Sequence, residues 1–194
     1  MMRIFSHFDH PVDDAQHTFR RLLKALSEPG VLVALPPLSG WQPLNPATTS
    51  LLLTLADQET PLYLDAALSS AEVQHNLRFH TGAPLTASSA TSSFALFGEA
   101  VTAEQLAACP AGDELSPEDA TTVVIQTGSL HHGIALRLRG PGIEHSRMVA
   151  PQLPAAVLNY LLNRPAAFPA GIDFLFTCGE SLMAIPRTTH VEVC

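Results

Sequence analysis

Ile172-Asp-Phe-Leu-Phe-Thr-Cys-Gly-Glu-Ser-Leu-Met-Ala-Ile185 is the stretch with the clearest structural signal, because two apolar runs flank a short polar turn. Gly179 can supply the positive φ that a tight turn requires. The stretch therefore predicts an antiparallel hairpin over residues 172–185 that turns at residues 178–180. Its apolar contacts are expected from Ile172, Phe174, Phe176, Met183 and Ile185.

Working outward from the hairpin, shorter apolar runs alternate with helix signals. Strands are predicted at residues 31–35, 61–65, 93–97, 121–126 and 134–138. Helix starts are predicted at Pro46, at Ser69 or Ser70, at a capping box formed by Thr102 and Gln105, and at Pro154. This alternation predicts an α/β fold, a mixed β-sheet flanked by helices, with antiparallel pairing toward the C-terminal end. Residues 1–194 are expected to form one domain.

The first helix is predicted at residues 14–27, capped by Asp13 or Asp14 and ended by Pro29-Gly30. Its stripe of Phe19, Leu22, Leu23 and Leu26 is expected to face the core. The only lysine of the chain, Lys24, lies in this helix. A Schiff base to pyridoxal phosphate and a phosphate-binding loop both need a lysine at the site, so we expect neither and predict no cofactor.

Composition narrows the classes of function further. The net charge of −8 disfavours sequence-independent binding of nucleic acid, which needs basic surface. The apolar runs are too short to span a bilayer, and the start of the chain lacks the apolar core of a secretory signal. Three cysteines without a CxxC spacing fit a reducing cytoplasm. Only 14% of the residues are charged, which favours an oligomer or a subunit of a complex.

No catalytic or metal-binding motif is evident. The nine histidines show no spacing that places two imidazoles on one face of an element, so no metal is predicted. Cys178 lies in a turn without a partner in the sequence, and the glycines at 140 and 142 lack the lysine of a phosphate loop.

Arginines are the candidate anion-binding residues, since a guanidinium matches the geometry of phosphate and carboxylate. Arg137 and Arg139 are two apart, so both side chains should leave the same face of a strand. Arg187, Thr188 and Thr189 follow Pro186 and should lie together in a loop after the hairpin. The alternatives are solvated charges or salt bridges to some of the 18 acidic residues.

Several motifs, taken in order, resemble one family. They are Phe19-Arg-Arg with Ala25-Leu-Ser-Glu-Pro-Gly30, Arg78-Phe-His-Thr-Gly82, Leu138-Arg-Gly-Pro-Gly-Ile143, Phe168-Pro-Ala-Gly-Ile-Asp173 and Ile185-Pro-Arg-Thr-Thr189. This order resembles PhnH, the H subunit of the bacterial carbon–phosphorus lyase system for using phosphonates. The resemblance covers about residue 14 to the last residue, and residues 1–13 are expected to be a variable segment. It adds Arg78 to the candidate anion-binding or partner-binding residues.

The resemblance implies an accessory role in phosphonate catabolism. In that pathway the G, H and I subunits, with the L protein, transfer the ribose triphosphate part of ATP to a phosphonate, and the J subunit later cleaves the carbon–phosphorus bond. It also implies a fold like the large domain of pyridoxal-phosphate transferases without the cofactor, a cytoplasmic homodimer, and docking with the G, I and J subunits. Direct nucleotide or phosphonate binding or catalysis by this chain, and an unrelated small-molecule enzyme, remain the alternatives.

Overall fold

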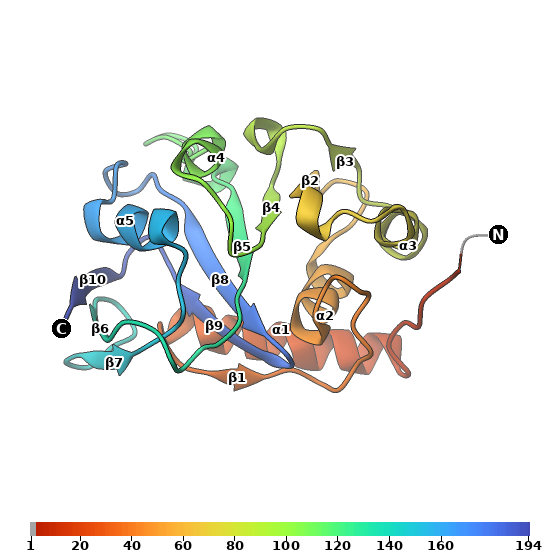
Figure 1. Ribbon diagram of the computed structural model, residues 1–194, viewed down its shortest axis with the longest axis horizontal. Coiled ribbons are helices and arrows are strands. Elements are labelled where there is room, and N and C mark those ends of the chain that lie inside the picture. The colour runs from red at the N-terminus through yellow and green to blue at the C-terminus, as the bar shows by residue number, and fades with distance from the viewer. Residues whose placement is uncertain (1–2) are drawn as a thin grey trace.

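A seven-stranded sheet forms the centre of the protein, as a computed structural model describing residues 3–194 shows (Figure 1). The strand order is β1-β9-β8-β5-β4-β2-β3. Neighbours from β3 to β8 pair in parallel, and β9 runs antiparallel to both β8 and β1. The strands are β1 (Val33–Ala34), β2 (Leu62–Leu64), β3 (Leu85–Thr86), β4 (Phe94–Phe97), β5 (Thr122–Gln126), β8 (Asp173–Cys178) and β9 (Ser181–Ile185). The predicted mixed sheet is confirmed.

The hairpin of β8 and β9 has the predicted register. Phe174 pairs with Ile185 and Cys178 with Ser181, and Gly179 has a φ of 56° at the turn. The five expected apolar residues are all buried in the core, which confirms their contribution. Phe174 and Phe176 stack with their ring centroids 5.9 Å apart.

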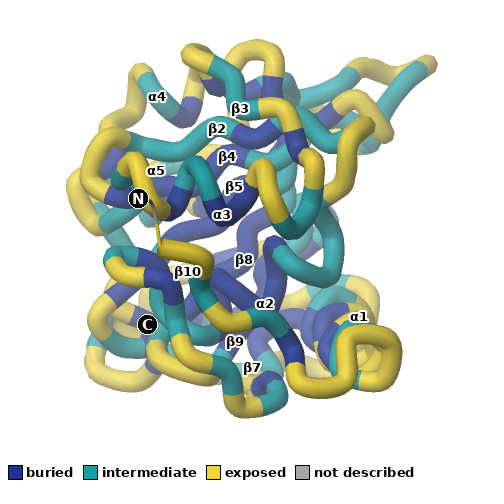
Figure 2. Tube along the Cα trace, turned by 90° about the vertical axis from the view of Figure 1, so that its right-hand side faces the viewer, coloured by how far each residue is buried: buried dark blue, intermediate teal, exposed yellow. Residues whose placement is uncertain are grey.

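Helices cover both faces of the sheet. The helices are α1 (Pro11–Ser27), α2 (Pro46–Leu55), α3 (Ala71–Thr81), α4 (Ala103–Ala108) and α5 (Ala155–Asn163), with short 3-10 turns at Ala66–Leu68, Ser89–Thr91 and Pro117–Asp119. The first three pack on one face and the last two on the other. Within β5, Val124 faces the first group, whereas its neighbours Val123 and Ile125 face the second. The central strands are accordingly buried on both sides (Figure 2).

Local capping signals in the sequence identified most helix starts. The Asn45 side chain accepts from the Thr48 backbone N–H at 2.8 Å, and the Ser70 side chain accepts from Val73 at 3.1 Å. The capping box of Thr102 and Gln105 is present with both of its hydrogen bonds. These side chains satisfy backbone N–H groups that lack a partner within the helix.

The first helix differs from its prediction in its start and in its buried face. It begins at Pro11, and Asp14 lies in the first turn, where its carboxylate accepts from the His10 backbone N–H at 2.9 Å. Leu22 is buried together with Thr18 and Ala25, whereas Phe19 and Leu23 are 45% and 49% exposed. The predicted stripe was therefore partly wrong, because small side chains provide much of the contact with the core.

The side chain of Lys24, in the same helix, faces solvent. It forms an ion pair with Glu28 one helical turn later, at 2.6 Å.

The structure also contains a second, three-stranded sheet, which the sequence did not predict. It has the antiparallel order β10-β6-β7, with β6 at Leu136–Arg139, β7 at Arg147–Val149 and β10 at His190–Val193. The strand expected at residues 134–138 corresponds to β6, whereas β3, β7 and β10 were missed. The inner residues Leu136, Leu138 and Val191 join the core between this sheet and the hairpin.

The segment before α1 is packed on the domain. The Phe5 backbone N–H donates to the Asn76 side chain at 2.7 Å, and the Trp41 indole N–H donates to the Ser6 carbonyl at 2.9 Å. The His80 ring lies 3.2 Å from the Phe5 carbonyl, and burial lowers the pKa of this imidazole. Met1 and Met2 of the predicted variable segment lie outside the described residues.

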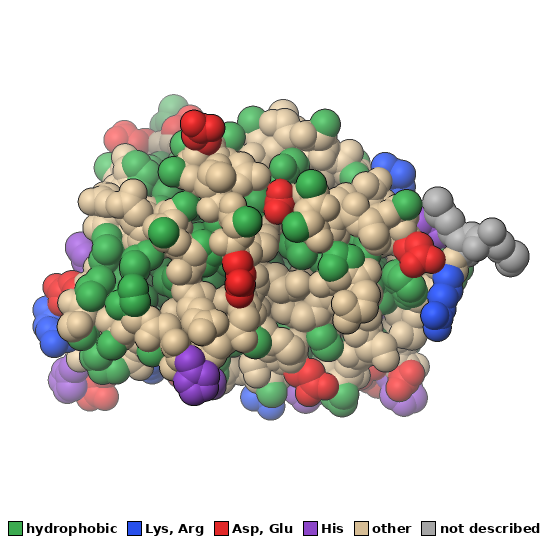
Figure 3. All heavy atoms as spheres, viewed as in Figure 1, with side chains coloured by type: hydrophobic (Ala, Val, Ile, Leu, Met, Phe, Trp, Pro, Cys, Tyr) green, Lys and Arg blue, Asp and Glu red, His purple; other side chains and the backbone are tan. Residues whose placement is uncertain are grey.

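Within residues 3–194, every helix is too short or too polar to traverse a lipid bilayer. On the face seen in Figure 3, Lys and Arg side chains lie near the edges of the view, and the central area is mostly uncharged.

The first prediction concerns the hairpin core. Phe176→Ala should lower the free energy of unfolding by about 3–5 kcal/mol, because it removes a fully buried ring and leaves a cavity. The matched control is Phe168→Ala, where the ring is 73% exposed and the change should be within about 0.5 kcal/mol. Urea denaturation measures both. Equal effects of the two substitutions would contradict this assignment of the core.

Candidate functional site

Arg187 is held firmly by its own chain. Its Nε and Nη2 donate to Asp173 Oδ2 at 3.1 and 2.7 Å, and its backbone N–H donates to Asp173 Oδ1 at 2.7 Å. Its Nη1 donates to the carbonyls of Pro117 and Pro169 at 2.9 and 3.1 Å. The side chains of Arg187 and Asp173 are only 16% and 22% exposed.

This geometry changes the interpretation of Arg187. The sequence predicted a loop and left a solvated charge or a salt bridge as the alternatives to anion binding. Its guanidinium is instead largely buried and joins the loop after β9 to β8 and to the segments of Pro117 and Pro169. Anion binding by Arg187 stays a prediction, and the alternative of a salt bridge to an acidic residue is confirmed by its pair with Asp173.

Arg164 was not identified from the sequence. It follows the last turn of α5, and its Nη2 donates to the carbonyls of Pro186 and Thr189 at 3.1 and 3.0 Å. Burial lowers the pKa of this guanidinium, because desolvation disfavours its charge. No local motif distinguishes Asn163-Arg-Pro165 from an ordinary helix end, so only the packed structure indicates its importance.

The two arginines contribute to one groove. A cavity of about 370 Å³ lies between the end of α5 and the segment that joins β9 to β10. Its lining comprises Pro141, Arg164, Ala166, Phe168, Arg187, Thr188, Thr189 and His190. The structure thus brings Arg187, Thr188 and Thr189 together, as predicted, and adds Arg164.

The other candidate arginines lie elsewhere. Arg137 and Arg139 leave the outer face of β6, because the alternating Leu136 and Leu138 are buried, and this confirms their predicted common face. Arg137 pairs with Glu192 of β10 at 3.7 Å. Arg78 is exposed in the last turn of α3. None of these three is part of the lining of the groove.

The carboxyl ends of β5 and β8 carry a different kind of polar cluster. Ligands of α/β sheets often bind at this edge. Here Gln126 accepts from the Asn45 backbone N–H at 2.8 Å and donates to the Pro43 carbonyl at 2.8 Å. The hydroxyls of Thr48 and Thr177 bond each other at 2.7 Å. These groups satisfy one another and fix the start of α2 against the sheet.

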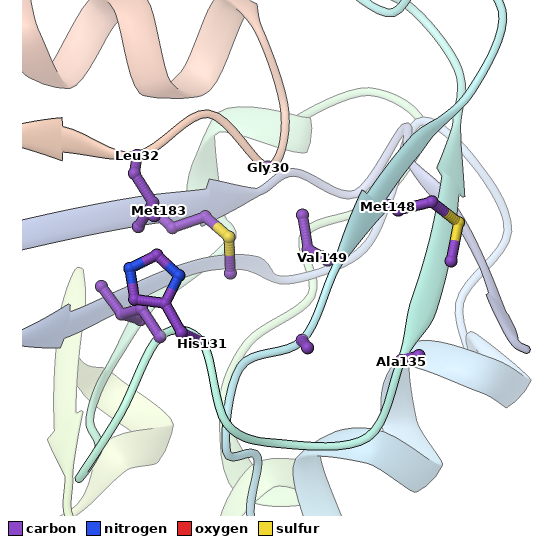
Figure 4. A pocket seen from close by; sticks show the side chains of 9 residues that line it. Gly30, Leu32, His131, Ala135, Met148, Val149 and Met183 are labelled. Carbon is purple, nitrogen blue, oxygen red and sulfur yellow. The ribbon is translucent and has the colours of Figure 1, made fainter.

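A second cavity of about 310 Å³ lies beside the loop that follows β5 (Figure 4). His131, Leu32 and Met183 lie close together in this view, and the sulfur of Met148 points away from them. The lining also contains Gly30, Leu130, Ala135, Val149 and Ala150. It includes no aspartate, glutamate, lysine or arginine. This cavity is lined mostly by apolar side chains and has few groups that could bind a charged ligand.

Two cysteines and the possible metal ligands were natural candidates for chemistry within residues 3–194. Cys178 donates to the Gly128 carbonyl at 3.3 Å, and burial raises the pKa of the Cys109 thiol, which disfavours a thiolate. No three His, Cys, Asp or Glu side chains of this range come together in an arrangement that could hold a metal ion.

Comparison with known proteins gives the family. The model of a family described as a bacterial phosphonate metabolism protein, PhnH, matches residues 6–192. The chain belongs to the PhnH family. The match begins within the segment that the sequence analysis treated as variable, in agreement with the packing of residues 5–8 on the domain.

Two curated relatives support this membership over nearly the whole chain. The alpha-D-ribose 1-methylphosphonate 5-triphosphate synthase subunit PhnH of Rhizobium meliloti (strain 1021) is 36% identical over 197 residues, which covers 95% of this chain and 94% of the relative. The putative C-P lyase subunit protein HtxG of Stutzerimonas stutzeri is 31% identical over 182 residues, which covers 92% of this chain and 86% of the relative.

The second prediction concerns Arg187. Arg187→Met should lower the free energy of unfolding by about 3–5 kcal/mol, because Asp173 would keep a largely buried charge without its partner. Arg139→Met is the matched control; this arginine is exposed, and the change should stay within about 0.5 kcal/mol. Thermal and urea unfolding measure both. A stable Arg187→Met protein would show that the buried pair contributes little.

Proposed function

We propose that this protein is an accessory subunit of the carbon–phosphorus lyase system. In this role it is required, with the G, I and L proteins, for transfer of the ribose triphosphate moiety of ATP to a phosphonate. The observation that carries the proposal is the 36% identity to a subunit named for this synthase, over 95% of this chain. We further propose that residues 1–194 form one PhnH unit, since a single family model spans residues 6–192.

The geometry favours an accessory role over catalysis by this chain. The polar groups at the carboxyl ends of β5 and β8 bond one another rather than converging on an open site. Arg187, the most extensively bonded of the candidate arginines, stabilises a junction of several segments. In both places the polar side chains stabilise the fold, which suits a subunit that acts by binding other proteins.

The finer features of the family extend the proposal. A seven-stranded sheet with only β9 reversed is compatible with a cofactor-free relative of the large domain of pyridoxal-phosphate transferases. We also propose a cytoplasmic location and contact with the G, I and J subunits, as a role beside phosphonate-activating enzymes would require. Family membership over residues 6–192 weighs against an unrelated small-molecule enzyme.

The exposed face of α1 supports a homodimer. Val12, Phe19 and Leu23 are 70%, 45% and 49% exposed, and their spacing of seven and four residues places them on one side of the helix. Large apolar side chains aligned in this way favour a contact with another protein surface. We propose that a second copy of the chain packs against this face.

The third prediction tests the accessory role. In a bacterium that uses phosphonates and lacks its own PhnH, this chain should restore growth on methylphosphonate as the sole phosphorus source. The tagged protein should also copurify with the G, I and J subunits. Growth on inorganic phosphate is the control, because it should not depend on the chain. Absence of both restored growth and copurification would count against the role.

The fourth prediction tests the homodimer. A charge at a central position of the interface must be desolvated without a partner, so Phe19→Glu combined with Leu23→Glu should give a monomer. Light scattering at micromolar concentration measures the mass, and circular dichroism verifies the fold. Phe79→Glu is the control on α3, where the ring is 63% exposed, and this variant should remain dimeric. An unchanged mass of the double variant would place the interface elsewhere.

A further inference from the structure

The groove beside α5 is locally basic in an acidic protein. Arg164, Arg187 and His190 belong to its lining, and no aspartate or glutamate does. Asp173 neutralises Arg187, which leaves the Arg164 guanidinium without an ion pair within residues 3–194. One unpaired guanidinium therefore remains in the lining, in a chain whose net charge is −8. The local charge suits an anionic ligand.

Buried polar atoms without partners gather at the same place. Within residues 3–194, five buried side-chain nitrogen or oxygen atoms lack a hydrogen-bond partner, and three of them are Arg164 Nε, Arg164 Nη1 and Thr189 Oγ1. Thr189 is only 2% exposed. Burial of unpartnered donors is costly, and for a guanidinium the cost is greatest. These atoms require acceptors, which the chain itself does not supply.

The backbone at Arg164 is also unusual. With φ 38° and ψ 80°, it is the only residue other than glycine with a positive φ among residues 3–194. Such a conformation is unfavourable for a residue with a Cβ atom, and it concentrates at functional sites. The bonds from Nη2 to the carbonyls of Pro186 and Thr189 hold the side chain against the loop after β9.

From this arrangement we propose that the groove binds a tetrahedral oxyanion, whose oxygens accept from Arg164 Nη1 and from the hydroxyl of Thr189. A charged guanidinium N–H is a strong donor to such a group, and a threonine hydroxyl adds a second bond. Pro141, Ala166 and Phe168 give the groove an apolar wall that suits an organic substituent. The choice of an organophosphonate or a nucleoside triphosphate as ligand rests on the proposed function.

Access to the arginine requires a small rearrangement. The three unpartnered atoms are covered in the structure, so side chains of the groove must shift to admit an oxyanion. Phe168 contributes to the lining and exposes 73% of its surface, so packing constrains it little. Its displacement would widen the groove without disturbing the core.

The binding test uses the full chain and three probes: methylphosphonate, inorganic phosphate and ATP. Isothermal titration should show saturable binding of at least one probe to the unaltered protein. Thr189→Val keeps the shape of the side chain and removes the unpartnered hydroxyl, so it should fold at least as stably while binding about tenfold more weakly. Arg164→Lys should weaken binding similarly, because a single ammonium group cannot both replace the bonds of Nη2 to the two carbonyls and stand in for Nη1 at the ligand. Arg139→Lys, outside the groove, is the control and should bind normally.

The probes also identify the source of the oxyanion. Tighter binding of methylphosphonate than of phosphate identifies an organophosphonate ligand, and tighter binding of ATP identifies the triphosphate. The proposal is overturned if no probe binds saturably at millimolar concentration, or if Thr189→Val binds as tightly as the unaltered chain. Because the titrations use the isolated protein, they can fail while the growth experiment on the accessory role succeeds.

Discussion

Burial of the β8–β9 hairpin on both faces is the constraint on which the remaining structure depends. Leu175 and Leu182 contribute to the core beneath α1 and α2, whereas Phe176 and Met183 contribute to the core shared with α5 and the smaller sheet. The hairpin therefore contributes to both apolar cores, as β5 does. Its open end is closed by the pair of Asp173 at the start of β8 and Arg187 just after β9. This polar contact thus joins the start of β8 to the end of β9.

Local signals made much of this fold predictable. The hairpin follows from a period-two pattern around Gly179, and the starts of α2, α3 and α4 follow from caps within three residues of the bonds that they satisfy. The missed strands β3, β7 and β10 lie in segments without a run of apolar residues, whereas the equally short β1 and β2 lie within the apolar segments 31–35 and 61–65. The buried face of α1 was assigned partly wrongly, because Phe19 and Leu23 are as apolar as Leu22 and only the packing distinguishes them.

The candidate site was less accessible to sequence reasoning. The loop of Arg187, Thr188 and Thr189 was recognised, but the role of Arg187 depends on Asp173, fourteen residues earlier, and on two carbonyls of distant segments. Arg164 was missed because its neighbours are set by the approach of α5 to the loop after β9. Such contacts arise from tertiary packing, which no spacing of residue types encodes.

The solvent-facing position of Lys24 has a practical consequence for studies of assembly. It is the only side-chain amine in the protein, and it lies on the same helix as Phe19 and Leu23, one residue beyond the latter. Among the side chains, amine-directed labels and crosslinkers therefore react with this one alone, on α1. A fluorophore placed there would respond to whatever surface covers that helix, and a crosslink formed there would mark the residue of the partner that approaches it.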